Sequence, residues 1–280
     1  MNKGQDSGQG RWKISVLGVR GSLPAAGAAF LEYGGNTSCM AVSCAGREIV
    51  LDAGSGLSYL KSPAGRVRRL DVLITHVHLD HVIGLPGLYA LQERGMEVHF
   101  YGEERYGIPF ERQMKTLFGK PYWPVGLEDS AASTVIHEVG PQMRFSLPGE
   151  DGSEISVFTL RGNHPDKSLL YRLQAGGKSL VYALDCEMND EMFAALSDFA
   201  KDSDLIIWDA GFIEGDMRRG WGHSTWEEGL ALKKAAGAKR ILMTHYSWGY
   251  TDTFLHEQER LAKQRDSACL FAKEGMVLTL

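Results

Sequence analysis

Residues 75–81, Thr-His-Val-His-Leu-Asp-His, place four metal-type side chains within six consecutive positions. They directly follow residues 70–74, Leu-Asp-Val-Leu-Ile, an apolar run that predicts a buried strand. Side chains alternate along an extended chain, so both imidazoles of the His-x-His pair point to the same side. Asp80 and His81 then stand at the start of a new turn, where a second ion could share the site.

The residue types in this stretch indicate a metal site, and more specifically a two-metal site. Neutral imidazole and carboxylate groups suit zinc and its borderline neighbours manganese and iron. The alternative is a polar loop that happens to be rich in histidine. The whole chain holds nine histidines in 280 residues, so three within six positions disfavour that alternative.

The remaining sequence alternates apolar runs with amphipathic segments and shows no internal repeat. Strands are predicted over residues 13–17, 38–42, 48–51, 72–74, 97–101, 155–160, 168–173, 179–184, 205–208 and 240–243. Helices are predicted over residues 85–94, 109–118, 190–200, 225–236 and 253–264. Strands in meanders, followed by strands that alternate with helices, suit two packed sheets with helices outside.

Further polar side chains stand just past the ends of predicted strands. An Asp-Ala-Gly-Ser-Gly turn over residues 52–56 follows the run 49–51. His164 follows the run 155–160, Asp185 follows 178–184, and His245 follows 240–244. Because they lie just past strand ends, one edge of a layered fold would gather them with the stretch 75–81.

This ordered set, from about Ile14 to His245, is similar to the signature of the metallo-β-lactamase-fold hydrolases. The resemblance implies an α/β fold, a four-layer αββα sandwich of two mixed β-sheets flanked by helices. It also implies two divalent metal ions, foremost Zn²⁺, with Mn²⁺ or Fe²⁺ as alternatives. On this basis His76, His78 and His164 hold one ion, Asp80, His81 and His245 hold the other, and Asp185 bridges them.

A second resemblance concerns proton transfer. Residues 222–225, Gly-His-Ser-Thr, resemble the His-Ser-Thr signature of ribonuclease Z and related phosphodiesterases, and residues 206–212 resemble their His-Glu-Ala-Thr-Phe segment. In that family the carboxylate orients the histidine, which donates a proton to the leaving group. The resemblance implies the same roles for Asp209 and His223, with Asp80 as a further catalytic residue. Two departures stand out, because Asp209 replaces a glutamate and Trp208 replaces a histidine.

The same motif also has a purely structural interpretation. Ser224 and Glu227 fit a capping box at the start of a helix, and His223 would then be a solvent-exposed residue without a catalytic role.

The substrate is expected to be small. Ribonuclease Z carries a long arm between its third histidine and the bridging aspartate, whereas only 20 residues separate His164 from Asp185 here. A net charge of −5 and a pI near 6.0 give no overall attraction to RNA phosphates, so long nucleic acid is not favoured. The basic groups at 66–69 and at Arg218 and Arg219 are interpreted as solvent-exposed surface. Arg218 and Arg219 lie just before His223, however, and could contact a substrate phosphate.

These features favour a phosphodiesterase for a small or cyclic nucleotide-like substrate, acting by metal-hydroxide attack with His223 as proton donor. Antibiotic-hydrolysing relatives generally lack the bridging aspartate, so Asp185 argues against a β-lactamase. Three alternatives stay open: a lactonase or thioesterase with the same metals, a tRNA 3′-end processing endonuclease, and a non-catalytic metal-binding sensor.

Composition sets the remaining expectations. Residues 1–11 are expected to form a disordered or tag-like tail without a signal peptide, and residues 12–280 a single metallo-hydrolase domain. No apolar run reaches the ~20 residues of a membrane helix. The scattered cysteines, Cys39, Cys44, Cys186 and Cys269, indicate reduced thiols and a cytoplasmic location. The oligomeric state stays open, with a homodimer among the options.

Two segments are candidates for shaping the pocket. Gly-rich loops over 18–24 and 33–38 resemble the first loop of the phosphodiesterase branch, where the backbone approaches the metals, or they are ordinary turns. Residues 118–124, Phe-Gly-Lys-Pro-Tyr-Trp-Pro, form either an aromatic lid on the substrate or a covered hydrophobic loop.

Overall fold

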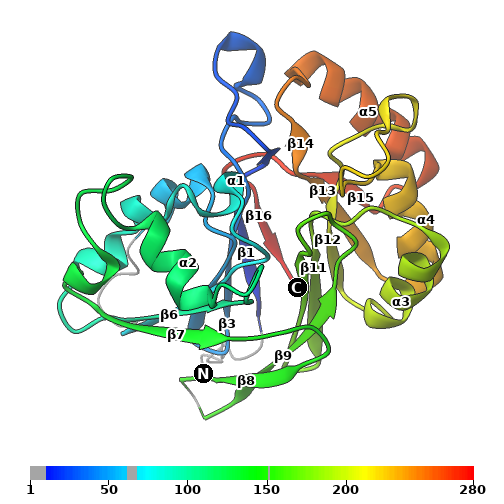
Figure 1. Ribbon diagram of the computed structural model, residues 1–280. Helices are drawn as coiled ribbons and strands as arrows, with labels where there is room; N and C mark the ends of the chain where they lie inside the picture. Colours follow the sequence, from blue (N-terminus) through cyan, green and yellow to red (C-terminus); the bar gives the residue numbers. More distant parts are fainter. Residues whose placement is uncertain (1–10, 62–67, 151) are drawn as a thin grey trace, which may run out of the picture.

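The computed structural model describes residues 11–61, 68–150 and 152–280. Within them, two mixed β-sheets pack face to face and helices cover the outer face of each (Figure 1). The chain is therefore α/β, with the four-layer αββα arrangement that the resemblance implied, and this expectation is confirmed. The predicted tail falls on residues 1–10, outside the described residues, apart from Arg11.

The first sheet is antiparallel at one side and parallel at the other. Its order is β16 (Val277–Thr279), β1 (Lys13–Gly18), β3 (Cys39–Cys44), β4 (Arg47–Leu51), β5 (Arg69–Leu73), β6 (Glu97–Gly102) and β7 (Ser133–Glu138). Strands β16 to β4 pair antiparallel, and β4 to β7 pair parallel.

The second sheet has the same organisation. Its order is β15 (Cys269–Phe271), β13 (Arg240–Thr244), β12 (Leu205–Asp209), β11 (Lys178–Ala183), β10 (Leu169–Ala175), β9 (Glu154–Arg161) and β8 (Arg144–Pro148). Strands β8 to β11 pair antiparallel, and β11 to β15 pair parallel. In both sheets the parallel strands deliver their carboxyl ends to one edge, where the polar loops gather.

The core explains why the central strands read as continuous apolar runs. In β4, Ile49 and Leu51 pack between the two sheets, while Val50 packs under the helices of the first sheet. Alternating side chains are therefore buried on both faces, as expected for sheets covered on both sides.

The α-helices are α1 (Leu79–Val82), α2 (Phe110–Leu117), α3 (Asp190–Phe199), α4 (Trp226–Ala236) and α5 (Asp252–Arg265). Short 3-10 turns are η1 (Ala28–Phe30), η2 (Ser55–Tyr59), η3 (Leu85–Gly87), η4 (Tyr89–Gln92), η5 (Leu127–Asp129) and η6 (Glu214–Asp216). Helix α2 lies outside the first sheet, and α3, α4 and α5 lie outside the second (Figure 1).

The helix predicted over 85–94 is wrong. The segment forms η3 and η4 instead, because Pro86 and Gly87 interrupt a continuous helix. Gly84 also packs against the loop that follows β4. A Cβ atom on residue 84 would lie 2.0 Å from the Gly54 carbonyl oxygen.

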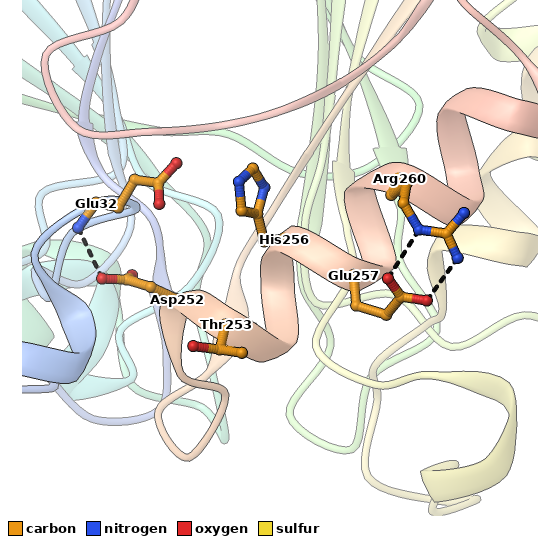
Figure 2. Close-up of a pocket in the computed structure, with 6 residues that line it drawn as sticks. All are labelled: Glu32, Asp252, Thr253, His256, Glu257 and Arg260. Carbon is orange, nitrogen blue, oxygen red and sulfur yellow. Dashed lines mark hydrogen bonds and ion pairs between the residues drawn. The ribbon is translucent and has the colours of Figure 1, made fainter.

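Two short contacts join the halves of the chain beside the edge where the loops meet. Strand β2 (Arg20–Gly21) pairs parallel with β14 (Tyr246–Ser247). The loop carrying η1 is held to the start of α5, because the Asp252 carboxylate accepts hydrogen bonds from the backbone N–H groups of Glu32 (2.8 Å) and Tyr33 (3.1 Å); the first is drawn in Figure 2. Among the described residues, no helix combines the length and apolar character that a bilayer crossing requires.

Candidate metal centre

The side chains predicted to bind metal lie together at the loop edge shared by the two sheets. They come from the segment after β5 and from α1, and from the residues that follow β9, β11 and β13. The set is His76, His78, Asp80, His81, His164, Asp185 and His245.

Three histidines form the first group. The ring centroids of His76 and His78 are 4.3 Å apart, and that of His164 lies 4.8 Å and 5.1 Å from them. One nitrogen from each ring can meet the others within 4.8 Å, a spacing that a single cation can span. The His-x-His pair thus points to one side, as the extended backbone requires.

The second group consists of Asp80, His81 and His245. The Nε2 atom of His81 lies 3.2 Å from the Asp80 carboxylate, and that of His245 lies 3.8 Å from it. All three side chains are buried, and their ligand atoms also fall within 4.8 Å of one another.

Asp185 stands between the two groups. Its Oδ2 atom faces His81 at 3.0 Å and His245 at 3.3 Å. Its Oδ1 atom faces His164 at 3.8 Å and His76 at 4.0 Å. A carboxylate that offers one oxygen to each group has the geometry needed to bridge two cations.

Polar groups behind the cluster fix the orientation of its rings. Asp52 accepts from Nδ1 of His81 at 2.7 Å, Ser38 pairs with Nδ1 of His245 at 2.7 Å, and Asp166 pairs with Nε2 of His78 at 2.6 Å. Such partners select the ring nitrogen that remains free for a metal. Sequence reasoning did not assign these three residues, although Asp52 opens the turn after β4 and Asp166 lies two residues beyond His164.

Two proposed metal ligands and one residue that supports a ligand have an unusual backbone conformation. Asp52, Asp185 and His245 have φ of 55°, 52° and 62°, the left-handed region that side chains other than glycine rarely adopt. Each follows the end of a parallel strand, so the turn directs the side chain into the cluster. Non-glycine residues in this conformation concentrate at functional sites.

The first Gly-rich loop does approach the cluster. A Cβ at Gly21 would lie 2.5 Å from the His245 ring, so a larger residue would displace that ring. The next residue, Ser22, donates its backbone N–H to Oδ2 of Asp80 at 2.7 Å.

Two of the histidines and both carboxylates have charge states that suit cations. Burial lowers the pKa of His76 well below its usual range and that of His164 to about 4, so both imidazoles are neutral. Burial alone would raise the pKa of Asp80 and Asp185, but the neighbouring histidines outweigh it and hold both below their usual range. At His81 and His245 burial lowers the pKa, but the neighbouring carboxylates outweigh it and raise the pKa of both. Neutral imidazole and ionised carboxylate are the forms that bind metal.

Unpartnered atoms give an independent test of this fit. Among the described residues, Nε2 of His76, His81 and His245 and Oδ2 of Asp185 are buried without a hydrogen-bond partner. Although Nε2 of His81 lies 3.0 Å from Asp185, the contact lacks the direction of a hydrogen bond. Buried polar atoms are normally satisfied, so four unpartnered atoms within this cluster suit a binuclear metal site.

His223 and Asp209 form a pair at the rim of this cluster. Nδ1 of His223 lies 3.0 Å from Oδ2 of Asp209, and its ring centroid lies 5.3 Å from that of His245. Burial lowers the pKa of His223, but the Asp209 carboxylate outweighs this effect and raises it to about 9. Asp209 is fully buried and also accepts the backbone N–H of Asp185 at 3.0 Å, so the pair is tied to the cluster.

The predicted capping box is displaced by one residue. Thr225, not Ser224, is the N-cap of α4, and Glu228, not Glu227, completes the box. Ser224 instead donates its hydroxyl to the Cys186 carbonyl at 2.5 Å. Capping therefore does not involve His223. Trp208, at the position of the family's histidine, is a fully buried core residue whose indole donates to the Thr225 carbonyl.

A cavity of about 340 Å³ opens beside His223 and His245, lined mainly by residues 211–221 and 247–250. The aromatic segment 118–124 does not line it, and Tyr122 and Trp123 are 74% and 39% exposed. A separate cavity of about 460 Å³, between η1 and α5, is lined by charged and polar side chains such as Glu257 and Arg260, which pair at 2.7 Å (Figure 2).

Comparison with known proteins agrees with this geometry. The model of the "Beta-lactamase superfamily domain" matches residues 47–246. A ribonuclease Z of Bradyrhizobium diazoefficiens is 28% identical, with 85% of this chain and 91% of that protein covered.

Solved structures share the fold. The metallo-β-lactamase fold protein YhfI of Bacillus subtilis superposes with a TM-score of 0.72 at 22% identity, covering 97% of this chain and 100% of that one. The short form of human tRNase Z gives 0.66 at 23% identity, covering 95% and 98%. The matched family segment contains every side chain of the cluster and spans most of the chain. The chain therefore belongs to the β-lactamase superfamily, and it is a hydrolase of that superfamily.

Proposed function

We propose that this protein is a phosphodiesterase that hydrolyses small phosphodiesters, of nucleotide-like or cyclic type, in the cytoplasm. The observation that carries the proposal is the pairing of His223 with the buried Asp209 carboxylate at 3.0 Å, at the rim of the metal-type cluster. Hydrolysis of an alkyl phosphodiester needs a proton for a poor leaving group, and a carboxylate-backed imidazole supplies one. The unpaired thiols of all four cysteines accord with a reducing compartment.

The cluster would hold two divalent cations, for which Zn²⁺ is our first choice because imidazole dominates the donor set. His76, His78 and His164 would hold one, Asp80, His81 and His245 the other, with Asp185 shared between them. Such ions supply an activated water and neutralise charge on the phosphoryl oxygens.

The protein's own side chains and backbone would position and deliver the proton for the leaving group. Asp209 orients the His223 ring through Nδ1, which leaves Nε2 to give its proton to the departing oxygen. Gly211 fixes the Asp209 carboxylate by donating its backbone N–H at 2.8 Å.

The tRNA-processing alternative is supported by the curated relative named ribonuclease Z. Against it, the chain between His164 and Asp185 is filled by the hairpin of β10 and β11, which leaves no arm to grip a tRNA. The cavity volume of about 340 Å³ also lies at the lower end of the range for small-molecule sites. We therefore favour a small substrate.

The decisive experiment compares His223→Ala with wild type on two leaving groups. General acid catalysis contributes about 10²–10⁴-fold, so kcat/KM should fall by about that factor on an alkyl or cyclic phosphodiester. A nitrophenolate leaves largely unaided, so the loss on an aryl phosphodiester should be markedly smaller. His256→Ala, which removes an exposed histidine from α5, is the matched control and should match wild type.

Metal content, measured in parallel, distinguishes the rivals. Equal losses on both substrates, or fewer ions in the His223 variant, would make His223 a ligand or a structural residue. Turnover of lactones or thioesters alone would favour the rival hydrolase. Cleavage of a tRNA precursor with no small phosphodiester accepted would establish the endonuclease. Bound metal without any turnover would leave a sensor.

A further inference from the structure

The cavity beside the metal-type cluster has an aromatic wall that the proposed chemistry does not use. Phe212, Trp221, Trp248 and Tyr250 all line it, together with the proposed proton donor His223. Trp221 and Trp248 are 52% and 44% exposed, although indole rings are normally well buried. Exposed aromatic rings gathered around one cavity indicate a binding surface.

The two tryptophans are presented by loops that are fixed from behind. The Arg20 guanidinium, buried under β14, donates to the carbonyl of Tyr250 at 2.7 Å and to that of Ser247 at 3.3 Å, and so holds the turn that carries Trp248. On the other side, Gly220 and Gly222 flank Trp221. Their backbone N–H groups donate to the Glu187 carboxylate at 2.6 Å and 3.2 Å.

Trp221 is also oriented by its neighbours. The Arg218 guanidinium lies 4.9 Å from the centre of its ring, and the Phe212 ring meets it edge-on at 6.5 Å. The walls of the cavity are therefore formed before a ligand arrives, which reduces the entropy lost on binding.

Apart from its histidines, the cavity carries one cationic and one anionic side chain, Arg218 and Asp216. Arg218 lines the cavity and is exposed, so it can meet a phosphate, whereas Arg219 turns away to the Met188 carbonyl and to Glu228. His223 and His245 also line the cavity, and the scissile phosphate would lie beside them. Aromatic rings bind nucleobases by stacking and tolerate any base.

We propose that this cavity is the subsite for the leaving nucleoside, whose base stacks on Trp221 and Trp248. The inference rests on the proposed function, because His223 marks the leaving-group side only if it is the proton donor. The substrate class is then a phosphodiester with at least one nucleoside, and the volume of about 340 Å³ suits one nucleoside on that side.

The test separates binding from turnover. Dissociation constants of the metal-loaded protein are measured by calorimetry for thymidine 5′-monophosphate and for deoxyribose 5-phosphate, which carries a hydroxyl group in place of the base. Stacking is expected to favour the nucleotide by about ten-fold or more. Trp221→Leu and Trp248→Leu should each reduce this ratio, and Trp248→Phe should restore part of it. Tyr59→Leu, which removes an exposed ring lining a different cavity, should leave the ratio unchanged.

Turnover is followed on a thymidine dinucleotide and on the analogue whose leaving nucleoside lacks its base. A preference for the dinucleotide that falls in both tryptophan variants supports the subsite. Hydrolysis of both at equal kcat/KM, with equal affinity for the two phosphates, overturns the subsite and leaves the phosphodiesterase intact. If neither substrate is hydrolysed, and no cyclic phosphodiester is hydrolysed either, the proposed phosphodiesterase activity is overturned. The affinity ratio then decides whether the cavity binds a base.

Discussion

Asp185 is the residue on which the two-metal interpretation depends. It is the side chain whose two oxygens face different histidine groups, with His81 on one side and His164 on the other. Its left-handed backbone, at φ 52°, is a conformation that aspartate tolerates better than most residues.

Replacing Asp185 with Ala should remove at least one ion, because the bridging oxygens are lost while both histidine groups remain. Elemental analysis should find close to two ions per chain in the wild type and one or fewer in the variant. Asp198→Ala, an exposed aspartate on α3, should keep both. A single ion in both the wild type and the Asp185 variant would remove the bridging role.

Asp52 contacts a proposed metal ligand but is not itself one of the proposed ligands. Its carboxylate accepts from Nδ1 of His81, from the Thr75 N–H and from the Tyr182 hydroxyl, so it fixes the ring of His81 within the core. Asp52→Asn keeps the left-handed backbone and the shape but loses the charge. Metal affinity should fall by about 10–100-fold, measured by chelator competition, as expected for a partner of a ligand histidine. Unchanged affinity would show that the Asp52 charge does not contribute to metal binding.

At the level of elements, the sequence was most informative where strands end. Apolar runs and the polar residues beyond them predicted the edge where His164, Asp185 and His245 meet, because strands of one sheet share an edge. Turns were less predictable: the apolar residues of 85–94 fit a helical period, yet Pro86 lacks an N–H and the segment divides in two. Strands β7 and β8 were missed because most of their side chains are half-exposed or exposed and form no continuous apolar run.

Partners that come from distant segments could not be predicted at all. Ser38 and Asp166 orient their histidines across 207 and 88 residues of chain, and no local spacing signals such a pair. The N-cap of α4 shows a finer limit, since Ser224 and Thr225 both satisfy the capping pattern with a glutamate three residues later. The tertiary bond from Ser224 to Cys186 decides between them.

The N-cap of α4, Thr225, lies two residues after His223, so this cap contributes to the stability of that region. The Thr225 hydroxyl accepts from the Glu228 N–H at 3.2 Å, and the Glu228 carboxylate accepts from the Thr225 N–H at 3.0 Å. Thr225→Ala should lower the free energy of unfolding by about 1 kcal/mol, measured by urea denaturation. Thr225→Ser, which keeps the hydroxyl, should lie closer to wild type. Equal stability of the two variants would exclude the hydroxyl from the cap.

At the scale of the whole molecule, the cluster lies across the seam between the two sheets. His76, His78, Asp80 and His81 follow the first sheet's β5, whereas His164, Asp185 and His245 follow strands of the second. Bound cations would therefore connect the two halves of the sandwich as well as supply chemistry, and they would offset the burial of Asp80 and Asp185 together.

Removal of metal should therefore destabilise the entire fold. A ligand that binds only the native state adds about 2.7 kcal/mol when its concentration is about 100-fold above Kd. For chains of somewhat smaller size, each kcal/mol of lost stability lowers Tm by about 2–4 °C. Chelation should therefore lower Tm by roughly 5–10 °C for each ion removed. Calorimetry before and after chelation, with metal content checked, gives the shift, and Asp185→Ala should show a smaller one because it holds fewer ions. If Tm does not change after confirmed removal of both ions, the seam is held by packing alone and the cations have no structural role.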